Sequence, residues 1–269
     1  MRPVEALTPY LVVCSVALVV AVMTLFSGFG LGTLLLPAFA VFFPVEVAVA
    51  AVAVVHLANN LFKLALIGRW ARWDIVATFG TVSALGAFAG AWALSKLAAG
   101  HVLAEYALAG HPCRVTVTGL VIGAVIIVFG ALEFSERLER ATIPPKLMLV
   151  GGFLSGFFGG LSGHQGALRS AFLLRAGMTK EQLVGTRAAC AVVVDLSRLL
   201  VYGLTFMGAD WAVLRDRGGV GLVVAASLAA FAGSYAGARL VKSATMMVVR
   251  RVVAVALLLM GVALGAGVL

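Results

Sequence analysis

The chain is 269 residues long, 62% of them hydrophobic and only 12% charged, whereas about a quarter of the residues in a soluble domain are charged. So few charges could not cover a soluble fold, which excludes a soluble enzyme and a disordered chain. The net charge of +9 does not indicate nucleic-acid binding, because the Lys and Arg residues lie mainly between apolar runs, as in cytoplasmic loops of membrane proteins. The composition therefore predicts an all-α polytopic membrane protein.

Apolar stretches of about 20 residues, the length needed to cross a bilayer, follow one another along the chain. They lie near residues 10–27, 45–68, 73–98, 113–132, 147–163, 180–206, 218–241 and 247–267. Two shorter apolar pieces, 31–43 and 166–176, each follow a glycine-rich break. We therefore expect each half of the chain to contain about four full spans and one short broken helix.

The two halves resemble each other, which predicts an internal duplication. The matching pieces are Ser27–Pro37 with Leu161–Ala171, Trp73-Asp74 with Asp210-Trp211, and Gly86-x-x-x-Gly90 followed by Lys96 with Gly233-x-x-x-Gly237 followed by Lys242. We expect a first repeat at 1–132, a cytoplasmic linker at 133–146 and a second repeat at 147–269, together forming one membrane domain.

Positive charge indicates how the repeats are oriented. If each short piece crosses the bilayer, the 16 Lys and Arg residues outside the apolar segments divide 11 against 5, and if each dips in and back out they divide 8 against 8. The minority of five is Arg2, Lys96, Arg114, Arg215 and Arg217. Because positive loops face the cytoplasm, we expect inverted repeats with both chain ends outside, although residues 10–43 are short for two regular crossings.

The glycine-rich breaks are the first candidate binding features. Unwound backbone survives at membrane depth only inside protein or beside a wet cavity, and a helix that begins there points free N–H groups toward an anion. The candidate residues at the two breaks are Gly30, Gly32, Thr33, His164, Gln165 and Gly166. Small residues also pack helices closely, as the four-residue spacing of Gly152, Gly156 and Gly160 indicates. Two breaks in matching positions favour the binding interpretation.

Polar residues on the span at 45–68 share one face. His56, Asn59, Asn60 and Lys63 lie within an arc of about 100° on an otherwise apolar helix. Because burying such groups in hydrocarbon is costly, we expect them to face the bundle interior and line a pathway. The alternatives are snorkelling of Lys63 and interhelical hydrogen bonds from the two Asn residues.

The span at 180–206 carries Arg187 and Arg198 on one face, with Cys190 and Asp195 beside them. Asp195 is most simply the partner of Arg198, and with His56 it is a candidate ion pair or proton relay. The alternative is an ion-pair network that only holds helices together. With Lys63 and Arg169, the ionisable groups inside the apolar segments have a net charge of +3, which favours an anionic ligand. No motif for a metal, a cofactor or an enzyme reaction is present.

These residues together resemble the TauE/SafE family of sulfite and organosulfonate exporters. The likeness covers about residues 15–265. It rests on the paired breaks, the first of which is closed by Leu-Leu-Leu-Pro37, on Gly185-Thr186 and on the Asp–Trp pairs. The second break differs from the family pattern, because His164 and Gln165 replace glycine and Ala171 replaces proline. The resemblance implies export of a small sulfur oxyanion from the cytoplasm.

We therefore expect a secondary transporter in the cytoplasmic (inner) membrane that exports sulfite or a short organosulfonate by alternating access. Its expected partners are that anion and the lipid bilayer, with no nucleic acid, and the sequence leaves the oligomeric state open. The alternatives are a cation or metal permease using His56, His164, Cys190 and Asp195, and a membrane-embedded enzyme or scaffold. Proton exchange and simple electrodiffusion both remain open as the coupling.

Overall fold

The computed structural model describes residues 3–27, 31–98, 101–108, 110–134, 144–174, 176–205, 218–240 and 246–268, most of them helical. The first half contains α1 (Pro3–Ser27), α2 (Leu31–Ala40), α3 (Val45–Ile67), η1 (Gly68–Trp70), α4 (Trp73–Ile75), the π-helical turn η2 (Val76–Gly80), α5 (Thr81–Ala98), β1 (Val102–Leu108), β2 (His111–Thr116) and α6 (Val117–Phe134). The second half contains η3 (Pro145–Leu147), α8 (Met148–Ser162), α9 (Gly166–Leu173), α10 (Lys180–Thr205), α12 (Gly219–Leu240) and α13 (Met246–Gly265).

Helices lie in the apolar segments predicted from the sequence, but several are shorter than the full spans expected there. Among the described residues, four helices are long and apolar enough to cross a membrane, namely Val45–Trp70, Trp73–Ala98, Lys180–Thr205 and Gly219–Gly237. Shorter apolar helices include α2 and α8. At 1.5 Å per residue, the 10 residues of α2 extend about 15 Å, half the thickness of the hydrocarbon layer.

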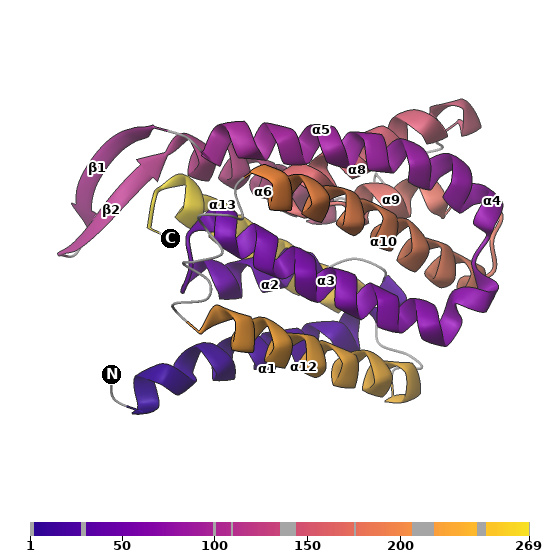
Figure 1. The fold of residues 1–269 in the computed structure, drawn as a ribbon, viewed down its shortest axis with the longest axis horizontal. Coiled ribbons are helices and arrows are strands. Elements are labelled where there is room, and N and C mark those ends of the chain that lie inside the picture. The colour runs from indigo at the N-terminus through magenta and orange to yellow at the C-terminus, as the bar shows by residue number, and fades with distance from the viewer. Residues whose placement is uncertain are drawn as a thin grey trace.

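One expected span is wrong at its beginning. The segment 113–132 was expected to be helical throughout, but residues up to Thr116 form β2, and α6 begins only at Val117. β1 and β2 pair antiparallel into a hairpin that extends from one end of the helical bundle (Figure 1). Gly110 has a φ of +81° at the turn, and Pro112 disfavours a helix interior. The fold is therefore helical with one added hairpin.

The helices pack in a row in which each neighbour comes from a distant part of the chain. α1 lies against α12, α12 against α3, α3 against α10, α10 against α5, and α5 against α8, while α6 packs against α13 (Figure 1). Among the described residues, each half therefore packs mainly against the other half.

The directions of the packed helices follow from their close contacts. Gly156 of α8 faces Ser83 of α5, and Gly160 faces Ala87, so α5 and α8 run parallel. Likewise Leu18 and Val22 of α1 face glycines of α12 in ascending order, Gly233 and then Gly237, so these two helices are also parallel. By contrast, α3 and α10 run antiparallel, and so do α6 and α13.

Glycines of α8 allow its backbone to approach α5. A Cβ atom at Gly156 or Gly160 would collide with the carbonyl of Ser83 or Ala87. These residues therefore act through close packing, which was the alternative interpretation of their four-residue spacing.

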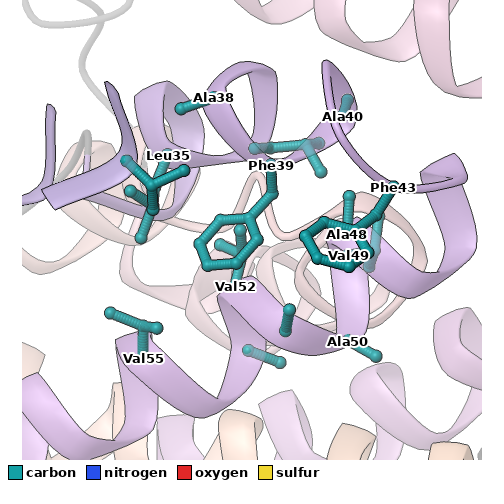
Figure 2. Close-up of a cluster of buried hydrophobic side chains, with 14 of the residues drawn as sticks. Leu35, Ala38, Phe39, Ala40, Phe43, Ala48, Val49, Ala50, Val52 and Val55 are labelled. Carbon is teal, nitrogen blue, oxygen red and sulfur yellow. The ribbon is translucent and has the colours of Figure 1, made fainter. Parts of the chain in front are cut away.

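An apolar cluster between α2 and α3 holds the short helix in place. Figure 2 shows Leu35, Phe39 and Phe43 lying against Val49, Val52 and other small residues of α3. The rings of Phe39 and Phe43 lie 6.2 Å apart, measured between centroids. This packing places the beginning of α2 beside the polar face of α3.

Candidate functional site

The two glycine-rich breaks meet at His56. Gly163 ends α8 with a φ of +82°, a left-handed conformation that glycine adopts without strain. A Cβ built on Gly32 of α2 would lie 3.5 Å from Cδ2 of His56 and 3.6 Å from the Gly163 carbonyl oxygen. The beginning of α2, the polar face of α3 and the turn between α8 and α9 therefore form one site.

The carboxylate of Asp195 is the centre of a buried network. Its Oδ2 lies 2.6 Å from Nδ1 of His56. Its Oδ1 accepts hydrogen bonds from Nη2 of Arg198 at 2.8 Å, from Nε of Arg198 at 3.1 Å and from Nε2 of Gln165 at 3.2 Å. Asn60 donates from Nδ2 to the His56 carbonyl at 2.8 Å. The Asp195 carboxylate is thus contacted from α3, from α10 and from the turn between α8 and α9.

Arg198 also ties α10 to the end of α8. Its Nη1 donates to the Gly159 carbonyl at 3.2 Å, and the hydroxyl of Tyr202, one turn further along α10, donates to the Gly160 carbonyl. These carbonyls belong to the last turn of α8, and that of Gly159 also accepts a hydrogen bond from the backbone N–H of Gly163. The spacing of four between Arg198 and Tyr202 was the available sequence signal for this second contact.

Arg169 lies in α9, immediately after the second break, and is only 2% exposed. Its Nη1 donates to the Arg187 carbonyl at 2.9 Å. Its Nε and Nη2 atoms are buried and have no hydrogen-bond partner among the described residues. The guanidinium is therefore anchored through Nη1, whereas its Nε–Nη2 edge makes no hydrogen bond among the described residues.

Lys63 lies on α3, two turns after His56, and is 7% exposed. It makes no ion pair among the described residues. Because His56 lies beside Asp195 and Ile67 beside Gly185, Lys63 lies at the height of Ala188 and Ala189 along α10. The polar stripe predicted on this helix therefore faces the bundle interior at Lys63, and the Lys63 side chain does not snorkel.

The buried charges of the described residues remain predominantly positive. Four buried cations, Lys63, Arg169, Arg187 and Arg198, accompany one buried acid, Asp195. Burying a charge without a counterion is energetically costly. This surplus of buried positive charge is therefore a distinctive feature of the site.

Asn59 and His164 lie at the edges of this arrangement. Asn59 accepts a hydrogen bond at Oδ1 from the Ser234 hydroxyl of α12, 2.8 Å away. The Nδ1 atom of His164 bonds to the Ser162 carbonyl at 3.0 Å, and its ring stacks on Phe129 at 5.8 Å between centroids. Neither residue is hydrogen-bonded to the Asp195 carboxylate, so both lie outside the Asp195 network.

The remaining predicted residues lie at the beginnings of the short helices. Thr33 is buried on α2, and Gly166 is half-buried as the first residue of α9. Gly30, Asp210-Trp211, Lys242 and most of the linker 133–146 lie outside the described residues. Within the described part of the chain, no three His, Cys, Asp or Glu residues gather as a metal site would require.

Comparison with known proteins identifies the family of the chain. The model of the family described as sulfite exporter TauE/SafE matches residues 13–264, nearly the whole sequence. Neither the comparison with curated proteins nor that with solved structures finds a match. Members of this family are membrane transporters, and the several apolar helices of the fold agree with a multi-pass membrane protein. The chain therefore belongs to the sulfite exporter TauE/SafE family.

Proposed function

We propose that the protein exports a small sulfur oxyanion, sulfite or a short organosulfonate, across the cytoplasmic (inner) membrane by alternating access. The observation that carries the proposal is the buried surplus of positive charge at the meeting point of the two glycine-rich breaks. A cation permease would place a surplus of carboxylates there. The sulfur chemistry comes from the family.

Backbone groups and cations would hold the anion together. The first N–H groups of α9 have no intrahelical acceptor, and the residue before the helix, Gln165, makes no capping hydrogen bond with its side chain. Arg187, Arg169 and Lys63 supply positive charge beside this helix end. Arginine suits an oxyanion because its planar fork donates two parallel hydrogen bonds.

The helix directions agree with an inverted repeat, which would support alternating access. If α3 corresponds to α10 and α6 to α13, each corresponding pair runs antiparallel, as inversion requires. The contact of α1 with α12 and that of α5 with α8 exchange with each other under the same correspondence. The site between α3 and α10 then lies on the boundary of the two repeats, where rocking of one against the other would open it to either side.

The direct test is flux in proteoliposomes loaded with sulfite, methanesulfonate, sulfate or a divalent metal. Sulfur-oxyanion flux is expected in the wild type and is lost in Arg187→Gln, because the substitution removes a buried cation beside α9. Arg69→Gln is the matched control, since Arg69 is an exposed cation in η1. Metal flux without anion flux would contradict the proposal, and so would an unaffected Arg187→Gln variant.

A further inference from the structure

The four buried cations of the site are not equivalent. Arg198 makes two hydrogen bonds with the Asp195 carboxylate, so its charge is balanced within the protein. Lys63 and Arg169 form no ion pair among the described residues, although both are more than nine-tenths buried. Lys63 and Arg169 therefore contribute to the surplus of positive charge in the described site.

The guanidinium of Arg169 is preorganised to bind an anion. Its Nη1 is anchored on the Arg187 carbonyl at 2.9 Å, which orients the guanidinium plane. The unpartnered atoms are Nε and Nη2, and these two donors point the same way along one edge of the plane. That edge is the one that binds two oxygens of a carboxylate or another oxyanion in parallel.

Lys63 adds a second charge from another helix. α3 and α10 are antiparallel, with His56 beside Asp195 and Ile67 beside Gly185. Lys63 therefore lies at the height of Ala188 and Ala189 along α10, next to Arg187, whose carbonyl anchors Arg169. Bringing two like charges together away from water is unfavourable unless a ligand balances both. A singly charged ligand would leave one cation unbalanced.

We infer that Lys63 and Arg169 form the charged pair that binds the transported anion, and that this pair selects a doubly charged oxyanion, such as fully ionised sulfite, over a singly charged sulfonate. The inference rests on the proposed function, since it names the charge class of the same substrate. Arg198 then serves as a positioning residue that holds Asp195 and the end of α8.

Sulfate and methanesulfonate are the matched probes, because they have nearly the same shape and differ by one charge. In a calorimetric titration of the purified wild type, sulfate is expected to bind about tenfold more tightly or better, as one more charge-assisted contact would give. Equal affinity for the two probes would overturn the inference without the need for any variant.

Substitutions of Lys63 and Arg169 distinguish the contributions of the two residues to anion binding. Lys63→Met is expected to reduce sulfate affinity to about that of methanesulfonate, whereas Lys63→Arg keeps the charge and the preference. Arg169→Gln is expected to weaken the binding of both sulfate and methanesulfonate. The control Arg69→Gln should change neither, and elution as a single species in detergent would verify that each variant is folded. An unchanged sulfate preference in folded Lys63→Met would overturn the inference.

The proposed function can fail separately. Absence of sulfite flux together with a sulfate preference that depends on Lys63 would leave the pair valid and contradict sulfite export. Sulfite flux with equal affinity for sulfate and methanesulfonate would retain the transporter and remove the charge selection.

Discussion

Asp195 shows how a single side chain organises the site. It is completely buried and contacts His56, Gln165 and Arg198, which come from α3, the beginning of α9 and α10. A buried carboxylate is stable only when such partners compensate for its lost hydration. Removing its charge leaves the guanidinium of Arg198 enclosed without a counterion.

Asp195→Asn is therefore expected to lower the free energy of unfolding by about 3–5 kcal/mol, the usual effect of breaking a buried ion pair. Thermal unfolding in detergent would measure the change. Asp74→Asn is the matched control, because Asp74 is 61% exposed and pairs with Arg72 near the surface, where an ion pair contributes at most about 1 kcal/mol. Similar losses in both variants would show that burial does not increase the contribution of the Asp195 ion pair to stability.

Gly163 combines a backbone requirement with a contact to the site. Gly163→Ala strains a left-handed residue by about 1–2 kcal/mol and would place a methyl group 3.2 Å from Nη1 of Arg198. Gly177→Ala carries the same type of strain, at a φ of +65°, with nothing within 4 Å of the new atom. Both variants should be slightly less stable, but only Gly163→Ala should reduce anion flux. Equal flux in the two would indicate that the position of Arg198 does not matter for transport.

At the scale of the elements, the contact of α5 with α8 depends on missing side chains. Gly152, Gly156 and Gly160 follow one another at intervals of four, and α8 meets α5 along this face. In a bilayer, such packing replaces much of the hydrophobic driving force between helices. The loss of one glycine should therefore separate two backbones that now touch.

Gly156→Ala is expected to destabilise the protein by about 1–3 kcal/mol, as other overpacked sites are. Gly203→Ala is a suitable comparison, since Gly203 lies in α10 with nothing within 4 Å of an added Cβ. That variant should instead become more stable by about 0.5–1 kcal/mol, because alanine favours a helix. Thermal midpoints of the two purified variants should shift in opposite directions, and a shift of the same sign would contradict the packing argument.

At the scale of the whole molecule, the proposed inverted repeat makes a prediction about topology. The helix Trp73–Ala98 separates η1 from the hairpin, so Arg69 and Leu103 should lie on opposite sides of the membrane. From the charge distribution, we predict that Arg69 lies in the cytoplasm and the hairpin outside.

Cysteine labelling would test this arrangement in a chain whose three native cysteines are replaced. An impermeant maleimide added to intact cells should label Leu103→Cys, an exposed position of β1. Arg69→Cys should be labelled only after the membrane is permeabilised. Labelling of both from outside would exclude a crossing between them, and the reverse pattern would invert the proposed orientation.

The sequence alone determined the elements that local patterns encode. Runs of apolar residues predicted the spans, because hydrophobic length is a local property, and the 3.6-residue period predicted that Lys63 shares a face with His56. The hairpin was missed because a short apolar run next to a span does not distinguish a strand from a helix.

Only the tertiary structure decided which charges are balanced. The contact of His56 with Asp195 joins residues 139 positions apart, and the anchoring of Arg169 depends on the backbone carbonyl of Arg187, for which no pattern of residue types exists. The sequence shows how much charge the apolar segments contain. Folding decides where it is compensated, because a counterion is chosen by proximity in space, and here proximity is created by the packing of α3 and α9 against α10.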